Sequence, residues 1–222
     1  MWRDAVLVAG RDLRVELRSR VTVSQVVPFA LLVLVLFAFA LDPDRQLLER
    51  VASGLFWTAV LFSALLAIAR SAAIDETDGV RDALRLSGLD PAGVFVGKAA
   101  AVAAELLVLE VVLGVGVVVL YGADPTGVGL LVLASVAATA AVAATGTLYG
   151  ALVSGLRVRE TLLPLVLLPV LTPVLIGATR AWEGALAGAP ADGWPWCGLL
   201  AAFAVLYSVA GALVYGTLLE GS

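Results

Sequence analysis

Six long apolar stretches constrain this chain of 222 residues more than any other feature. A helix needs about 20 mainly apolar residues to cross the hydrocarbon core of a bilayer. Because 61% of the residues are apolar and only 14% are charged, no sizeable water-soluble domain is expected. We therefore predict an all-α integral membrane protein, one domain over 1–222, with an N-terminal helix over 1–20 and six spans. The predicted spans are about 21–41, 51–69, 99–121, 128–153, 161–179 and 196–219.

The distribution of Lys and Arg predicts the orientation of these spans. The connections on one side carry eleven of the fourteen basic residues, and those on the other side carry only Arg45, Arg50 and Arg180. Since cytoplasmic connections are enriched in Lys and Arg, both termini are expected in the cytoplasm. This arrangement suits a multi-pass protein of the bacterial cytoplasmic (inner) membrane. Trp182, Trp194 and Trp196 then lie at the outer face, where interfacial Trp is common. The outer connection 180–195 is rich in Gly, Ala and Pro, which predicts irregular structure.

Missing residue types exclude most enzyme classes. The chain has no His and a single Cys, Cys197, so it offers no His-based zinc site, no Ser–His or Cys–His pair and no intrachain disulfide. It also lacks a GxxxxGK[ST] phosphate loop, so any ATP must be bound by another subunit. We expect a non-catalytic membrane protein with no directly bound cofactor or metal and no nucleic-acid partner.

The first twenty residues predict an amphipathic helix. Val6, Ala9, Leu13 and Leu17 recur at helical spacing and should share one face. The flanking arginines could snorkel towards headgroups, which favours a helix lying in the inner interface. The alternative is that these arginines only set the topology. The remaining polar residues fall beside or opposite the apolar face: Arg3, Asp4, Arg11, Asp12, Arg14, Glu16 and Arg18.

The longest predicted cytoplasmic connection, 70–98, contains a second short helix. Residues 80–86 have an apolar stripe with charges beside it, and Ser87-Gly88 and Asp90-Pro91 are expected to stop a helix. A short amphipathic helix between two spans is suited to dock in a groove on a cytoplasmic partner, although a solvated helix that touches nothing is the alternative. The candidate docking residues are Asp75, Glu76, Asp78, Gly79, Arg81, Leu84 and Arg85.

Two kinds of residue inside the predicted spans could have a role in function. Glu105 and Glu110 lie in the third span, where a carboxylate is costly and is a functional candidate by default. They are about 140° apart around a helix and so do not form one pair. No Lys or Arg lies inside any predicted span, so each Glu is either protonated or hydrogen-bonded to a neighbouring helix, or takes part in a proton relay. The fifth span contains three helix-kink candidates, Pro164, Pro169 and Pro173, which could form a hinge or line a cavity.

Three strings resemble one known family. They are RDLRVELRSR running into LVLFAFAL, GLFWTAVLFSALLAIAR followed by Asp78-Gly79 and Gly97-Lys98, and LPVLTPVLIGAT at 168–179. Their order and spacing resemble the haem exporter protein B (CcmB) family, the permease of the cytochrome c maturation ABC transporter. The resemblance covers the whole chain and implies an ABC-2-type exporter fold. It also implies a cytoplasmic ATPase partner, a haem-handling membrane protein, a periplasmic haem chaperone and a homodimeric arrangement of the permease.

Two other functions are compatible with the residues. An ABC permease of the same fold could export a lipid, a drug or a polysaccharide, and composition alone does not separate it from the haem permease. A proton-coupled secondary transporter would use Glu105 and Glu110 and would need no ATPase, although the repeat symmetry typical of such carriers is not visible. An intramembrane enzyme is disfavoured because the chain lacks a nucleophile–base pair.

Overall fold

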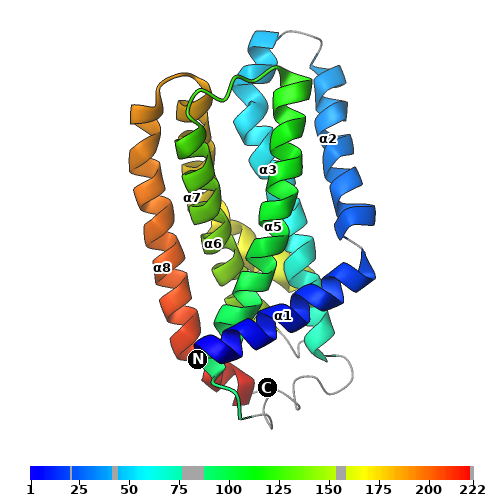
Figure 1. The fold of residues 1–222 in the computed structure, drawn as a ribbon, viewed down its shortest axis with the longest axis vertical. Helices are drawn as coiled ribbons and strands as arrows, with labels where there is room; N and C mark the ends of the chain where they lie inside the picture. Colours follow the sequence, from blue (N-terminus) through cyan, green and yellow to red (C-terminus); the bar gives the residue numbers. More distant parts are fainter. Residues whose placement is uncertain (21, 42–44, 77–87, 154–158, 221–222) are drawn as a thin grey trace.

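The described part of the chain is a bundle of long helices. The computed structural model describes residues 1–20, 22–41, 45–76, 88–153 and 159–220, and among these residues it contains helices and no strands. α1 crosses the others obliquely at the end of the bundle where both termini lie, which we name the termini end (Figure 1). The opposite end is named the far end. The helices are α1 (Trp2–Ser19), α2 (Val27–Ala40), α3 (Arg45–Glu76), α5 (Pro91–Tyr121), α6 (Val128–Val153), α7 (Arg159–Leu186) and α8 (Pro190–Glu220), with a π-helix (Thr22–Val26) preceding α2.

Five of the described helices are long and apolar enough to cross a membrane. These segments are Leu47–Ala73, Pro91–Tyr121, Val128–Val153, Thr161–Leu186 and Pro190–Leu218. A sixth is possible if Trp2–Ser19 and Ser24–Ala40, which meet at 50°, form one broken span. The part of the chain that the structure describes is thus all-helical, with five or six candidate membrane spans.

The start of α5 corrects the predicted connection 70–98. Asp90 is the N-cap of α5, with its Oδ1 accepting a hydrogen bond from the Ala92 N–H at 3.3 Å, and Pro91 is the first helical residue. Proline is favoured at this position because the first N–H has no partner within the helix. The predicted helix over 80–86 lies outside the described residues, so the prediction that Asp90-Pro91 ends it stays a prediction. Because α3 also continues to Glu76, the described part of 70–98 is mainly helical extension of two spans.

The connection 180–195 is also more regular than its composition predicted. α7 continues through Leu186 and α8 begins at Pro190, so only a tight turn separates them. Gly188 has φ 72°, a left-handed conformation that is open to glycine without strain. The prediction of an irregular connection was wrong because a turn this short uses Gly and Pro as helix boundaries. Pro164, Pro169 and Pro173 lie inside α7, which continues as one helix from Arg159 to Leu186.

Glycines on α5 let α1 pack closely against it. A Cβ on Gly93 would lie 2.8 Å from the Met1 carbonyl oxygen, and one on Gly97 would lie 2.6 Å from the Ala5 carbonyl oxygen. A pair of small residues four apart permits this kind of backbone approach between helices in membranes. The positions therefore explain why α1 lies on α5 rather than away from the bundle.

The core of the bundle combines small and aromatic residues. On α6 an added Cβ at Gly146 would collide with Ile68 of α3, so this glycine sets the distance between the two helices. Towards the far end Phe56 stacks on Trp182 with ring centroids 3.8 Å apart, which joins α3 to α7. Tyr121 donates a hydrogen bond of 3.0 Å to the Leu34 carbonyl and so joins α5 to α2.

Candidate functional site

Four charged side chains attach α1 to the bundle at the termini end. Lys98 Nζ of α5 lies 3.4 Å from Asp12 Oδ2, and the Lys98 side chain is only 3% exposed. Arg70 of α3 lies 2.7 Å from Glu16 Oε2 and also donates a hydrogen bond of 3.0 Å to Ser19 Oγ. We name Asp12, Glu16, Arg70 and Lys98 the charge cluster. It makes α1 a bridge between α3 and α5.

Glu105 belongs to the surroundings of this cluster. A small cavity of about 30 Å³ is lined by Glu105 together with Asp12, Glu16, Arg70 and Lys98. Arg70 and Lys98 lie within the candidate spans Leu47–Ala73 and Pro91–Tyr121. The expectation that no basic residue lies inside a span was therefore wrong for the spans as the structure has them. The helices extend beyond their most apolar parts, and Arg70 and Lys98 pair there with acids of α1.

α1 turns to the bundle a different face from the one that carries Val6 and Leu17. Ala5 and Val8 are buried, whereas Val6 is 70% exposed and Leu17 is 72% exposed. Asp12 and Glu16 also face the bundle, where they pair with basic residues on α5 and α3. Val6 and Leu17 of the predicted apolar face therefore point away from the bundle, as Trp2 and Leu7 do. That this face meets lipid stays a prediction.

Glu110 lies in different surroundings from Glu105. Its side chain is 5% exposed, and Glu110 Oε1 accepts a hydrogen bond from Thr139 Oγ1 of α6. Glu110 Oε2 is buried with no hydrogen-bond partner among the described residues. A buried polar atom without a partner costs about 1–3 kcal/mol. The structure therefore does not bring the two predicted carboxylates together into one site.

The predicted docking residues fall mostly outside the part of the chain that the structure describes. Asp75 and Glu76 form the last residues of α3 at the termini end. The other five lie within 77–87, which is outside the described residues: Asp78, Gly79, Arg81, Leu84 and Arg85. The docking hypothesis therefore rests on the positions of the helices that flank this segment.

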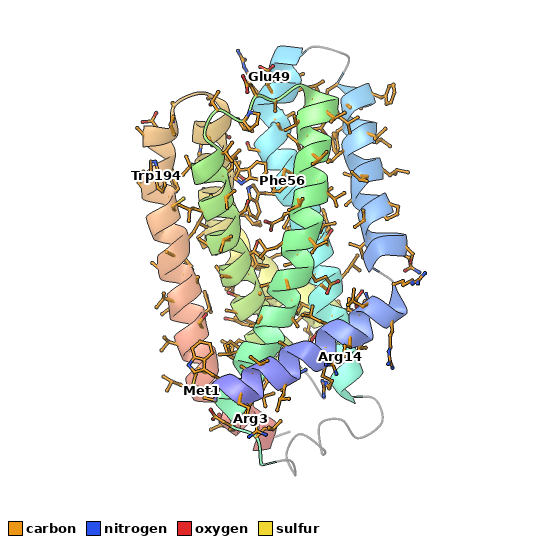
Figure 2. The ribbon with its side chains drawn as sticks, viewed as in Figure 1. Met1, Arg3, Arg14, Glu49, Phe56 and Trp194 are labelled. Atoms are coloured by element: carbon orange, nitrogen blue, oxygen red, sulfur yellow. The ribbon has the colours of Figure 1, made fainter. Side chains whose placement is uncertain are left out.

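Two cavities lie towards the far end and involve residues that sequence reasoning missed. The first, which we name the far-end cavity, has a volume of about 520 Å³ and is lined by Glu49, Arg50 and Ser53 of α3, by Ala123 and Asp124, and by Glu183, Leu186 and Ala187. Figure 2 shows Glu49 near the far end of α3, beyond Phe56. The second, the lateral cavity, has a volume of about 300 Å³ between α3 and α7. Its lining includes Trp57, Thr58, Thr179, Arg180 and Glu183.

Ser53 and Trp57 are the unusual members of these linings. Each is 1% exposed, yet Ser53 Oγ and Trp57 Nε1 have no hydrogen-bond partner among the described residues. By contrast, the buried Trp182 donates its indole N–H to Ser135 Oγ at 3.2 Å. In the sequence this pair is visible only as a polar residue and an aromatic residue four positions apart within an apolar span. Their lack of partners is visible only once α7 is placed.

Comparison with known proteins supplies the family. The model of the family described as CcmB protein matches residues 3–217. A heme exporter protein B of Haemophilus influenzae is 31% identical over 200 residues, covering 84% of this chain and 84% of the relative. One of Bradyrhizobium diazoefficiens is 31% identical over 205 residues, covering 90% of each chain. One of Escherichia coli (strain K12) is 32% identical over 226 residues, covering 93% of this chain and 88% of the relative. The match over nearly the whole length, on a helical bundle with several membrane-spanning segments, shows that this chain belongs to the CcmB family.

Proposed function

We propose that this chain is the permease subunit of an ABC transporter that serves haem delivery in the biogenesis of c-type cytochromes. The observation that carries the proposal is the family match over residues 3–217, together with relatives named heme exporter protein B. Because the sequence has no phosphate-binding loop, ATP is bound and hydrolysed by a separate cytoplasmic ATPase subunit. Haem is the cargo of the complex and is held by partner proteins.

The termini end of the bundle is the cytoplasmic end in this proposal, and the far end faces the periplasm. The excess of basic residues in the N-terminal segment and in the connections on that side supports the assignment. α1 then lies in the inner interface of the bacterial inner membrane. The exposed apolar side chains of Trp2, Val6, Leu7 and Leu17 support this position, because they face away from the bundle and can enter the lipid. Figure 2 shows Arg3 and Arg14 on the same helix. In the proposed arrangement their guanidinium groups reach the headgroups.

The proposed mechanism is a mechanical coupling through α3 and α5. These helices flank residues 77–87, and the charge cluster joins both of them to α1. Two copies of the permease sit over two ATPase subunits, and segment 75–85 of each copy docks in a groove of one ATPase. When ATP binding brings the ATPases together, the docked segments move α3, α5 and α1 as one unit. Coupling of this kind needs an element with two arrangements that both sites bias, and these three helices are that element.

The composition of the chain supports one version of the role of haem within the complex. It contains no His, and its single Met is Met1, so the two side chains that most often ligate haem iron are absent from the spans. This favours a function in which ATP hydrolysis drives release of a haem-loaded periplasmic chaperone from a haem-handling membrane protein. Transport of haem through the permease itself is the competing version of the same proposal.

Two other functions that the sequence predicts remain as alternatives to this proposal. An ABC permease of this fold could export a lipid, a drug or a polysaccharide. A proton-coupled transporter would use Glu110, and the buried Glu110 Oε2 without a partner is the observation that favours it. The two carboxylates, however, lie in separate surroundings: Glu105 lines the cavity beside the charge cluster, and Glu110 is hydrogen-bonded to Thr139.

The coupling step is tested by substitutions in the proposed docking segment. Glu76→Lys and Gly79→Pro should each reduce stimulation of ATP hydrolysis in the assembled complex by about fivefold or more. Insertion into the membrane should be unchanged. The matched control is Asp192→Lys, a charge reversal at an exposed acid in the first turn of α8, which should leave the stimulation unchanged. Stimulation that stays at the parent level in both docking variants would overturn the mechanism.

A further inference from the structure

The three acids of α1 all have partners in the rest of the bundle. Asp12 and Glu16 belong to the charge cluster, where they pair with basic residues of α5 and α3 at 3.4 Å and 2.7 Å. Asp4 Oδ2 accepts a hydrogen bond of 3.3 Å from the Asp90 N–H at the start of α5. All three side chains are half-buried. The negative charges of this helix are therefore turned towards the bundle.

The arginines of the same helix lie on its outer side. Arg3, Arg14, Arg18 and Arg20 are all exposed, and we name them the basic flank. Since successive residues of a helix are about 100° apart, the first three fall within about 60° of one another. In the described part of the chain no acid forms an ion pair with Arg14 or Arg18. α1 thus separates its acids from most of its bases and presents positive charge to its surroundings.

An apolar flank runs beside the basic flank along α1. It consists of Trp2, Val6 and Leu17, which are exposed and also fall within about 60° of one another. This flank lies about 90° around the helix from the basic flank. Neighbouring apolar and basic flanks suit a helix at the boundary between acyl chains and headgroups. The positive charge is therefore placed where phosphate groups of a membrane lie.

The helix that follows α1 holds the basic flank at this level. The chain bends by 50° between Trp2–Ser19 and Ser24–Ala40, and the second of these is almost entirely apolar. Arg18 and Arg20 lie where the chain turns from one helix to the other. A soluble protein partner would have to reach this turn past the headgroups, whereas lipid phosphates are already beside it.

The chemistry of the basic flank favours lipids with a net negative charge. A guanidinium group can donate two parallel hydrogen bonds to phosphate oxygens. Phosphatidylethanolamine and phosphatidylglycerol both have a phosphate, but only phosphatidylglycerol keeps a net charge, because it lacks the ammonium group. Each basic residue near a membrane surface strengthens the attraction to anionic lipids by about fivefold. A flank with several arginines should therefore distinguish the two lipids.

We propose that the basic flank of α1 is a binding surface for anionic phospholipids of the cytoplasmic leaflet. The guanidinium groups of Arg14 and Arg18 bind the lipid phosphates, and the apolar flank lies against the acyl chains. The ion pairs of α1 with the bundle contribute to selectivity, because they keep the acids away from the lipid. This inference rests on the proposed position of α1 in the inner interface, but it requires neither an ATPase nor haem.

Lipid retention tests the surface. The full chain is reconstituted in vesicles of equal amounts of phosphatidylglycerol and phosphatidylethanolamine and is extracted in a mild detergent, and the retained lipids are measured by mass spectrometry. The wild-type protein should retain about fivefold or more phosphatidylglycerol over phosphatidylethanolamine. In Arg14→Gln/Arg18→Gln the ratio should fall close to one. Arg14→Lys/Arg18→Lys keeps both charges and should keep most of the preference.

The matched control removes the same charge at the far end. Arg50→Gln/Arg180→Gln replaces two exposed arginines that lie among the acids of the far-end and lateral cavities. The lipid ratio should stay at the wild-type value in this variant. Folding of each variant is compared by its midpoint of thermal unfolding. If Arg14→Gln/Arg18→Gln unfolds early, Arg3→Gln/Arg20→Gln replaces it and should also lower the ratio.

Four results would overturn the surface. They are equal retention of the two lipids by the wild-type protein, an unchanged ratio in the folded Gln variants of α1, an equal loss in the far-end control, and loss of a protein partner instead of phosphatidylglycerol in the α1 variants. The last result would assign the basic flank to that protein. A chain that keeps the lipid preference but co-purifies with no ATPase would support this surface and contradict the proposed coupling, so the two failures are distinguishable.

Discussion

Lys98 Nζ lies 3.4 Å from Asp12 Oδ2, although the two residues are 86 positions apart in the sequence. The contact joins the first helix to the base of α5, where the Lys98 side chain is 3% exposed. In a site this poorly solvated, a basic side chain depends on acidic partners. The position of α1, and with it the proposed coupling unit of α1, α3 and α5, therefore depends on this charge cluster.

Removing one acid of the cluster should destabilise the protein. Asp12→Ala is expected to lower the free energy of unfolding by about 3 kcal/mol, because breaking a buried ion pair leaves a charge poorly compensated. The effect is measured as a lower midpoint of thermal unfolding in detergent. Arg14→Ala, at an exposed position on the same helix, is the control and should have little effect. The double variant Asp12→Ala/Lys98→Met should recover most of the loss, and equal midpoints for Asp12→Ala and Arg14→Ala would contradict the account.

The close contact between α1 and α5 predicts a steric effect at Gly97. In Gly97→Val the new side chain would start 2.6 Å from the Ala5 carbonyl oxygen, so α1 must move away. The movement is detected by the labelling rate of Val8→Cys in a chain whose Cys197 is replaced by Ala, since Val8 is 3% exposed in the wild-type protein. Labelling should rise in Gly97→Val. It should stay slow in Gly114→Val, because a Cβ on Gly114 meets nothing within 4 Å, and equally slow labelling in both would show that α1 does not pack as described.

Glu110 distinguishes the ABC permease from the proton-coupled transporter. In Glu110→Gln the amide oxygen can still accept the hydrogen bond of Thr139, so packing is kept while proton transfer is abolished. We expect assembly of c-type cytochromes to stay close to the parent level in a host that lacks its own family member. Glu110→Lys should fail to accumulate, because a lysine at the centre of a span costs about 2.5–3.5 kcal/mol. Complete loss of cytochrome assembly in Glu110→Gln would instead favour the proton-coupled mechanism.

The hydrogen bond between Tyr121 and Leu34 predicts a smaller effect at the far end. Tyr121→Phe removes the donor to a buried carbonyl of α2 and should lower the free energy of unfolding by about 1 kcal/mol. Tyr207→Phe, at a half-buried tyrosine of α8, is the matched control. Thermal unfolding measured side by side should separate the two variants. Identical midpoints would mean that α2 is held by apolar packing alone.

The periodicity and length of apolar stretches predict the number of long helices but not their ends. The predicted span 128–153 coincides with α6, because apolar residues continue to both of its ends. α3, α5, α7 and α8 are longer than the spans predicted for them. Hydropathy reports the part of a helix that lies in hydrocarbon, whereas helices continue into the interface as long as their backbone hydrogen bonds are satisfied. Asp90-Pro91 illustrates the difficulty, since the same dipeptide can end one helix or start another.

Long-range pairing is the part of the candidate site that the sequence could not show. Arg70 and Glu16 are 54 positions apart, and nothing local to either residue indicates that they meet. The amphipathic pattern of α1 indicates its apolar face, but it does not indicate that Asp12 and Glu16 meet Lys98 and Arg70. Ser53 and Trp57 were missed because an unpartnered donor is defined by the helices around it. Glu105 and Glu110 were found because a carboxylate within an apolar span is visible in the sequence itself.

Co-purification tests the central claim most directly. The protein is isolated from native membranes in a mild detergent, and its partners are identified by mass spectrometry. The account predicts recovery of a cytoplasmic ABC ATPase together with haem-handling membrane and periplasmic proteins. An ATPase without haem-handling partners would keep the permease and change its cargo. Reproducible isolation of an intact, functional protein with no ATPase would contradict the account.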